Sequence, residues 1–158
     1  VAKHEIALGG KERFHSVKSG IEALSDDVKT IAVHDAVRPL FSKKLIIKLI
    51  LEAEKHDAVI PVVAPADSYR VIDGEASKII DRSMLRMVQT PQVFNAQTLR
   101  KAYEQPFSAE FTDDASVVES MGGVIALCEG ERENIKLTTP SDMIFAEAII
   151  EAENESEL

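Results

Sequence analysis

An aspartate closely follows a short apolar run near the start of the chain. Asp35 comes two residues after Thr30–Val33, a β-type run typical of a central parallel strand buried on both faces. Open α/β folds bind ligands at the carboxyl ends of such strands, where a carboxylate can bind a divalent cation or a sugar hydroxyl. The residues alone leave a second interpretation open, in which Asp35 pairs with Arg38 or caps a turn.

Two adjacent glycines precede the first predicted helix. Gly9 and Gly10, followed by Arg13 and Ser16, would permit close approach of the backbone to a ligand at the start of that helix. Two glycines also serve simply to turn a chain, so this pattern alone is weakly specific.

Hydroxyl groups and one lysine at other element ends could hold a phosphate. Thr90 stands in a Thr-Pro-Gln break, Thr112 precedes two aspartates, and Lys136 lies in an extended segment. A lysine is a compact positive charge suited to phosphate groups. The bland interpretations are a helix N-cap for Thr112, with its helix over 113–121, and a solvated surface position for Lys136.

Composition excludes several other kinds of protein. The formal net charge is −9, from 27 acidic and 18 basic residues, which argues against binding to nucleic acid or to an anionic membrane surface. No apolar run approaches the roughly 20 residues of a membrane helix, and no signal peptide is recognisable, so a cytoplasmic location is expected. The four histidines lack ligand spacing, and the single cysteine, Cys128, is expected to be a small core residue.

Helical and strand patterns alternate along the 158 residues, which predicts a single α/β domain ending in an acidic tail over 151–158. Strands are predicted at 5–8, 30–33, 58–63, 85–89 and 124–128, with an extended segment at 135–138. Helices are predicted at 14–24, 43–55 (capped by Ser42), 96–104 and 113–121, and a last one opens at Thr139-Pro140 with Ile144, Ala148 and Ile149 toward the core.

The alternation is interrupted by a predicted β-hairpin. Residues 68–72 and 77–80 flank Asp73-Gly74, a dipeptide that supplies the positive φ angles of a tight turn. Neither strand is strongly apolar, so the hairpin is expected to project as an arm that finds a partner, often a second copy of the same chain.

Seven motifs occur in an order that is far more specific than any one of them. They are Gly9-Gly10-x-x-Arg13-x-x-Ser16-Val17-x-x-Gly20, His34-Asp35-Ala36-x-Arg38-Pro39, Asp67-Ser68, Asp81-Arg82, Gln89-Thr90-Pro91-Gln92-x-Phe94, Thr112-Asp113-Asp114-Ala115-Ser116 and Gly130-x-x-x-Asn134-Ile135-Lys136-x-Thr138-x-Pro140-x-Asp142. From Gly9 to Glu147 the series closely resembles the 2-C-methyl-D-erythritol 4-phosphate cytidylyltransferases of the non-mevalonate isoprenoid pathway.

The resemblance implies a Rossmann-like nucleotidyltransferase fold with a mostly parallel sheet, and a homodimer locked by the β-arm at about residues 67–82. It also implies a Mg²⁺-dependent reaction of CTP with 2-C-methyl-D-erythritol 4-phosphate, which gives 4-diphosphocytidyl-2-C-methyl-D-erythritol and pyrophosphate. Such a reaction needs positioning and charge neutralisation at phosphorus rather than a covalent protein group.

The resemblance also assigns roles to individual residues. In its terms Gly10, Lys11 and Ser16 line the cytosine pocket, and Asp35 and Ala36 hold the ribose and the metal side. By the same resemblance Lys136 neutralises the α-phosphate of CTP, and Thr90 and Thr112 contact the methylerythritol phosphate. Ser68 and Arg82 are likewise expected to reach across the dimer into the neighbouring site.

The sequence departs from the family pattern in three places. Ser68 stands where threonine is common, and Val37 where alanine is common. This sequence starts at Val1 and does not contain the glycine-rich loop and following lysine that bind the triphosphate in the family. Either processing or a missing N-terminal segment is expected. The chain by itself is therefore expected to be an incomplete enzyme.

Two alternatives remain open at this stage. One is the sister family of ribitol-5-phosphate cytidylyltransferases, which shares several motifs, although Asp81-Arg82 shortly before Thr90-Pro91 favours the methylerythritol enzyme. The other is a truncated, non-catalytic dimerising module. The reading frame upstream of Val1 would distinguish this module from the enzyme.

Overall fold

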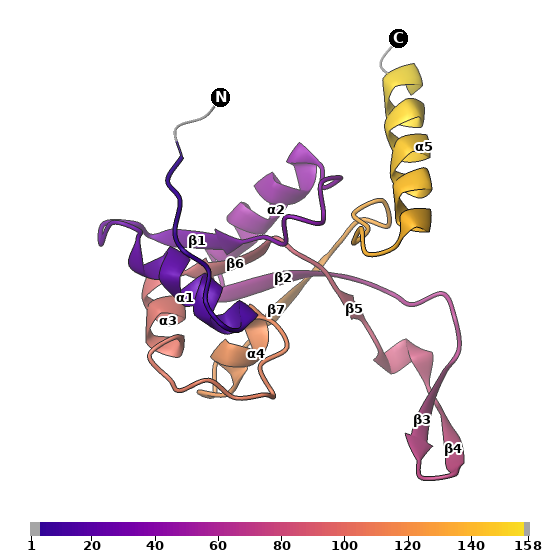
Figure 1. Cartoon of the computed structure of the whole chain (residues 1–158), viewed down its shortest axis with the longest axis horizontal. Helices are drawn as coiled ribbons and strands as arrows, with labels where there is room; N and C mark the ends of the chain where they lie inside the picture. The colour runs from indigo at the N-terminus through magenta and orange to yellow at the C-terminus, as the bar shows by residue number, and fades with distance from the viewer. Residues whose placement is uncertain (1–3, 157–158) are drawn as a thin grey trace.

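The computed structural model describes residues 4–156, and the side chains of residues 4–152. Within these residues a five-stranded mixed sheet lies between helices, and a two-stranded hairpin and a long helix extend from it (Figure 1). The sheet strands are β1 (Thr30–Val33), β2 (Ala58–Val63), β5 (Met87–Val88), β6 (Gln92–Asn95) and β7 (Ala126–Glu129). The helices are α1 (Arg13–Glu22), α2 (Lys43–Ala53), α3 (Ala96–Ala102), α4 (Asp114–Glu119) and α5 (Pro140–Ser156).

Three of the five sheet strands, β1, β2 and β7, run in the same direction, as a mostly parallel sheet requires. Strand β6 enters between β1 and β2 in the opposite direction, with Ile31 opposite Phe94 and Val59 opposite Val93. Strand β7 pairs in parallel along the other edge of β2. The carboxyl ends of β1, β2 and β7 therefore lie at one edge of the sheet.

Helices cover both faces of this sheet, and the period-2 alternation of the strands assigns side chains to each face. Val59 and Val93 pack with Leu45 and Leu49 of α2 and with Cys128, which is buried as predicted. Their neighbours Ala58 and Phe94 point the other way, into a cluster with α1, α3 and α4. The molecule is thus a three-layer α/β structure.

Two predictions about strands are wrong. Residues 4–10 form neither strand nor helix, and Ile6 and Leu8 are largely exposed, because no described strand lies beside them to complete a ladder. Strand β1 is not buried on both faces: Ile31 is buried but Ala32 is exposed, since among the described residues only one face of β1 is covered.

The predicted cap of α2 is confirmed and that of α4 is wrong. The Ser42 hydroxyl accepts a hydrogen bond from Leu45 N at the start of α2. At α4 the predicted cap is wrong by one residue, because Asp113 and Ser116 form a reciprocal capping box there. The Thr112 hydroxyl is therefore not used to cap the helix.

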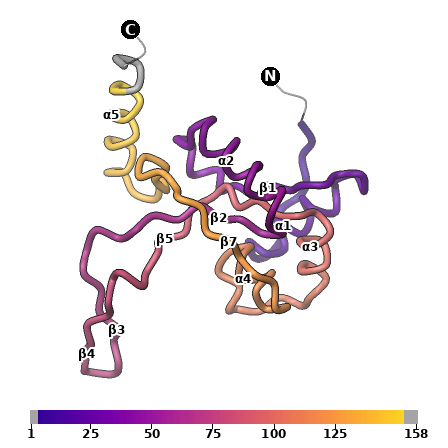
Figure 2. Tube along the Cα trace, turned by 180° about the vertical axis from the view of Figure 1, so that it is seen from behind, coloured from indigo at the N-terminus to yellow at the C-terminus, as the bar shows by residue number. Residues whose placement is uncertain are grey.

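The predicted hairpin is present as β3 (Tyr69–Asp73) and β4 (Ala76–Ile80), a separate two-stranded sheet followed by a 3₁₀ turn at Arg82–Met84. Gly74 takes a φ of 57° in its turn, a conformation that favours glycine. Both views show the hairpin projecting away from the main sheet (Figures 1 and 2).

Helix α5 begins at Pro140, as predicted, and stands apart from the sheet (Figure 1). The Asp142 carboxylate accepts hydrogen bonds from the backbone N–H groups of Thr138 and Thr139, which holds the pKa of this carboxyl below its ordinary value. The predicted core side of this helix is wrong in part: Ile144 is 68% exposed and Ala148 is exposed, whereas Ile149 is half-buried and the buried residue is Ala146. Ile144 and Ala148 are exposed because little of the described chain packs against the helix beyond its first turns; the predicted acidic tail lies partly outside the described residues.

Candidate functional site

A cavity of about 230 Å³ opens at the carboxyl edge of the sheet, beside β1 and between β5 and β6. It is lined by four of the residues predicted from the sequence: Asp35, Thr90, Thr112 and Lys136. These residues come from four separate segments of the chain, and the sheet brings them together. We refer to this cavity as the cleft.

Asp35 lies at the centre of the charges in the cleft. Its Oδ2 is 3.0 Å from Lys136 Nζ and 3.8 Å from Arg38 Nε, and its Oδ1 is 3.5 Å from Arg13 Nη2. Burial alone would raise the pKa of this carboxyl, but the hydrogen bond and charge of Lys136, together with Arg13 and Arg38, outweigh burial and lower it. Asp35 is therefore an anion in contact with three cations.

The backbone around Asp35 is fixed by two further contacts. The carbonyl of Asp35 accepts a hydrogen bond from Arg38 N at 2.9 Å, which closes a turn after β1. The Thr90 hydroxyl accepts from Asp35 N at 3.0 Å and lies 3.0 Å from His34 Nδ1. The turn at Asp35 that the second interpretation of this residue predicted is therefore present, and Thr90 holds it against the β5–β6 segment.

Lys136 is carried by an extended segment that is anchored through a buried asparagine. Asn134 is fully buried, and its side-chain N–H donates to the backbone carbonyl of Thr90 at 2.8 Å. The backbone carbonyl of Asn134 accepts a hydrogen bond from Arg38 Nη1 at 2.8 Å. The backbone N–H of Leu137 donates to the Val37 carbonyl. Lys136 lies between these anchors with its side chain 47% exposed, so its ammonium reaches the cleft while remaining accessible to solvent.

Arg13 also lines the cleft, although its place in the sequence motif indicated no role of its own. Its guanidinium donates two hydrogen bonds to Asp114, at 3.0 and 2.7 Å, and Asp114 is completely buried. Burial would lower the pKa of Arg13, but the bonds and charge of Asp114 raise it well above its ordinary value. The Gly9-Gly10-x-x-Arg13 spacing could have drawn attention to Arg13, but it did not indicate that Asp114, 101 positions later, is its partner.

The three residues predicted to line the cytosine pocket, and Ala36, which was predicted beside the ribose and the metal, lie outside the cleft. Gly10 N donates to Ser16 Oγ at 3.0 Å, which folds the loop over residues 9–12 onto the start of α1. Lys11 and Ala36 are exposed, and none of these four lines the cavity.

The two residues predicted to act across a dimer are also outside the cleft. Ser68 precedes β3, and Arg82 follows β4 and donates to the Ala66 carbonyl at the base of the hairpin. Because the hairpin projects away from the sheet, this chain does not bring them to its own Asp35 (Figure 1).

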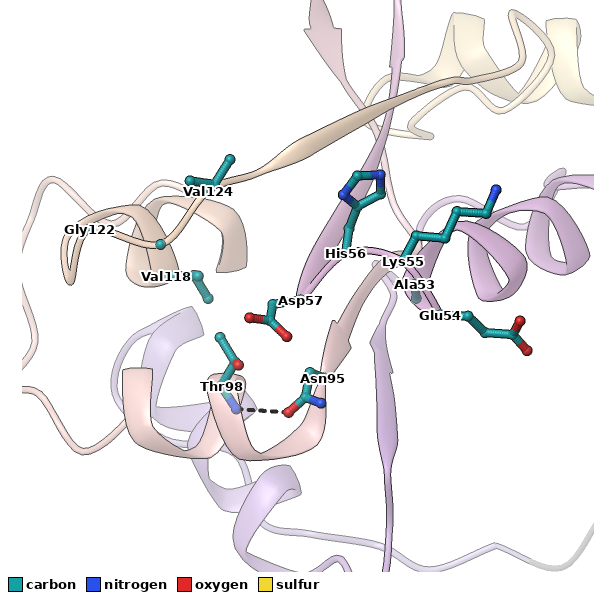
Figure 3. A pocket seen from close by; sticks show the side chains of 11 residues that line it. Ala53, Glu54, Lys55, His56, Asp57, Asn95, Thr98, Val118, Gly122 and Val124 are labelled. Carbon is teal, nitrogen blue, oxygen red and sulfur yellow. Dashed lines mark hydrogen bonds between the residues drawn. The ribbon is translucent and has the colours of Figure 1, made fainter.

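A larger cavity, of about 550 Å³, opens at the opposite end of the sheet (Figure 3). His56 and Asp57 precede β2 there, and Asn95 and Thr98 begin α3. The Asn95 side chain accepts from Thr98 N and so caps that helix. None of the predicted site residues lines this cavity, so its size alone does not mark the reaction site.

The cleft is lined by two carboxylates, Asp35 and Asp113, and both oxygens of Asp113 already accept hydrogen bonds, from Gln92 Nε2 and Ser116 N. Within residues 4–152, no group of three or more His, Cys, Asp or Glu side chains could hold a metal ion. Mg²⁺ in phosphoryl-transfer sites is commonly bound by one or two carboxylates together with substrate phosphates and water. These side chains would fit Mg²⁺ in that way, with Asp35 as the carboxylate whose oxygens contact, among the described residues, only the side chains of Lys136, Arg13 and Arg38.

A mixed α/β sheet with cations converging at its carboxyl edge suits a nucleotidyltransferase, because phosphate transfer depends on positioning and on neutralising charge. The sequence profile of the 2-C-methyl-D-erythritol 4-phosphate cytidylyltransferases (IspD) matches residues 2–152. The chain belongs to this family, and the prediction of a cytidylyltransferase of isoprenoid precursor biosynthesis is confirmed.

Relatives and solved structures agree with this assignment. The 2-C-methyl-D-erythritol 4-phosphate cytidylyltransferase of Bacteroides fragilis is 49% identical over 148 residues, which cover 94% of this chain and 67% of the relative. The one from Bacillus licheniformis is 43% identical over 156 residues, with 97% and 67% covered. The chain thus spans about two thirds of the length of these relatives.

The fold matches crystal structures of the same family. The enzyme from Thermus thermophilus has a TM-score of 0.79 at 35% identity, with 90% of this chain and 71% of that chain covered. The 4-diphosphocytidyl-2C-methyl-D-erythritol synthase from Anaerococcus prevotii has a TM-score of 0.82 at 31% identity, with 90% and 68% covered. These matches favour the methylerythritol enzyme over the ribitol-5-phosphate sister family.

Proposed function

We propose that the cleft beside Asp35 is where the phosphate of 2-C-methyl-D-erythritol 4-phosphate is joined to the α-phosphate of CTP. A phosphate oxygen of the first substrate forms the new bond to the α-phosphorus, and the bond to the β-phosphate oxygen breaks, so that pyrophosphate leaves with the electron pair. The observation that carries this proposal is the convergence of Lys136, Arg13 and Arg38 on one carboxylate at the sheet edge. A reaction between two polyanions needs positive charge fixed in place before the substrates arrive.

Within this proposal Lys136 is the group that neutralises the α-phosphate. Its ion pair with Asp35 is the resting arrangement, and its partial exposure leaves the ammonium free to turn toward a bound anion. Asp35 would hold Mg²⁺ and a ribose hydroxyl; when bound, the metal supplies further charge neutralisation on the triphosphate. Thr112, whose hydroxyl does not cap α4, and Thr90 would contact the methylerythritol phosphate.

The remaining roles are proposals supported by the local structure. Gly10, Lys11, Ser16 and, beside the cleft, Ala36 would contact the CTP nucleoside, and the Gly10–Ser16 hydrogen bond supports a preformed loop for it. The acidic net charge and the single buried cysteine support a cytoplasmic location without nucleic-acid partners. The projecting hairpin supports a homodimer in which Ser68 and Arg82 serve the neighbouring cleft.

Steady-state kinetics of the whole enzyme test the proposal. Pyrophosphate release from CTP should require 2-C-methyl-D-erythritol 4-phosphate, and ribitol 5-phosphate should not replace it. Lys136→Ala should lower kcat by about a hundred- to a thousandfold, because a fixed cation contributes most where charge develops in the transition state. The matched control is Lys55→Ala, an exposed lysine at the other end of the sheet that pairs with Glu52.

Three outcomes would contradict the proposal. A Lys136→Ala kcat within a factor of two of wild type would return Lys136 to the surface-lysine interpretation. Equal turnover of ribitol 5-phosphate would favour the sister activity. Absence of any CTP-dependent pyrophosphate release would favour the non-catalytic module.

A further inference from the structure

We infer that Asp114 and Tyr103 are positioning residues for this reaction: together they hold the Arg13 guanidinium at the wall of the cleft, where it faces the substrate phosphates. The inference rests on the proposed function of the cleft. It concerns two buried side chains that do not line the cleft themselves.

The geometry is that of a clamp closed from two sides. Arg13 Nη1 and Nη2 donate to the two oxygens of Asp114, at 3.0 and 2.7 Å. The Tyr103 hydroxyl donates to Asp114 Oδ1 at 2.6 Å. The carboxylate is thereby fixed by three hydrogen bonds, and it in turn fixes the plane of the guanidinium.

The free part of the guanidinium is directed at the cleft. Arg13 is 38% exposed, lines the cavity, and places Nη2 3.5 Å from Asp35 Oδ1. Asp114 has no exposure at all. One end of this ion pair is therefore sealed in the protein, while the other end retains N–H donors for an anion in the cleft.

A purely structural role explains this arrangement poorly. Taking a carboxylate out of water costs several kcal/mol, and apolar residues of similar volume often stabilise a core at least as well as a buried ion pair. The neighbours of Tyr103 are in fact apolar, including Phe14, whose ring stacks on it at 4.7 Å. The polar cluster lies inside a hydrophobic one, at the point where that cluster meets the cleft.

The charge states of the clamp support a fixed arrangement. Burial and the charge of Asp114 raise the pKa of Tyr103 far above its ordinary value, so the phenol keeps the proton that it donates. The stacked ring of Phe14, adjacent to Arg13 in sequence, keeps the hydroxyl aimed at the carboxylate. Tyr103 therefore restricts Asp114, and Asp114 restricts Arg13.

The test uses Tyr103→Phe and Asp114→Asn in the whole enzyme. Tyr103→Phe keeps the ring and its stacking and removes one hydrogen bond to the carboxylate; we expect kcat/KM to fall about three- to tenfold. Asp114→Asn should cause a larger loss, and Asp114→Glu should restore part of it because the negative charge returns. Ser120→Ala is the matched control, since it removes hydroxyl hydrogen bonds from the other end of α4.

A double-mutant cycle separates positioning from stability. If Tyr103 acts through Arg13, Tyr103→Phe should have little further effect on kcat/KM in an Arg13→Gln background, whereas a general packing defect would add to it. The inference would be wrong, and the proposed function of the cleft would stand, in either of two cases. One is wild-type kinetics in a folded Tyr103→Phe or Asp114→Asn variant. The other is a Tyr103→Phe effect that is unchanged in the Arg13→Gln background. An inactive wild type would overturn the proposed function and the inference with it. Should Asp114→Asn not fold, Tyr103→Phe and the cycle still decide.

Discussion

Asp35 is kept ionised by its neighbours, and this makes the stability of the protein depend on pH. Its pKa is lowered in the folded state, so its contribution to the free energy of unfolding is present above its ordinary value of 3.8 and is lost as the pH falls through the folded value. We expect the stability difference between wild type and Asp35→Asn to shrink as the pH is lowered from about 6 to about 3. Denaturant unfolding of both proteins across this range measures the difference.

The comparison with Asp35→Asn is needed because other carboxylates, such as Asp142, also have lowered pKa values. Their loss affects both proteins equally and cancels in the difference. A stability difference that stays constant down to about pH 3 would mean that the ion pairs with Lys136, Arg13 and Arg38 contribute little.

At this scale the sequence predicted the members of the cleft better than their connections. Asp35, Thr90, Thr112 and Lys136 could be found because each stands at an element end within an ordered set of motifs. The link between Arg13 and Asp114 could not, because the two residues are 101 positions apart and only the packing of α1 against α4 joins them.

The loop before α1 requires a residue without a side chain at Gly10. A Cβ atom on Gly10 would lie 2.3 Å from His15 Cβ, too close for any contact, so Gly10→Ala must displace the loop and its bond to Ser16. We expect the KM for CTP to rise several-fold in this variant, with little change in melting temperature because the loop is exposed. Steady-state kinetics and thermal unfolding measure the two effects.

Gly20→Ala is the control for this prediction. Gly20 lies within α1, and a Cβ atom there would meet nothing within 4 Å. The substitution should therefore leave the KM for CTP unchanged and stabilise α1 by up to about 1 kcal/mol. Equal KM values for the two variants would show that the loop does not contact CTP.

The sequence predicted the type of most elements but not what covers them. Apolar periodicity located β1 and α5 correctly, yet it could not show that only one face of β1 is packed or that Ile144 points to solvent. The failure at Thr112 has a different cause: two adjacent residues could both cap α4, and only the side chain of Ser116, which completes the capping box, selects Asp113.

Two elements leave the same side of the molecule in divergent directions, the β3–β4 hairpin and α5 (Figures 1 and 2). Each exposes large apolar side chains, with Ile72 70% exposed on the hairpin and Phe145 62% exposed on α5. Apolar area of this kind gains about 25 cal/mol per Å² when it is buried. A second copy of the chain offers one way to bury the hairpin, and the proposed homodimer follows from it.

Mixing two inactive variants tests both the dimer and the assignment of the hairpin to the neighbouring cleft. If Arg82 serves the other subunit, a hybrid of Arg82→Ala and Lys136→Ala protomers contains one cleft with both residues intact and one cleft with neither. Random exchange makes about half of the dimers hybrid, so activity should recover to about a quarter of wild type, although each variant alone is nearly inactive. If Arg82 acted within its own chain, every cleft in the mixture would lack one residue and no activity would return. Sedimentation of the wild-type enzyme should show a dimer at the assay concentration, and a fully active monomer would exclude the exchange of arms.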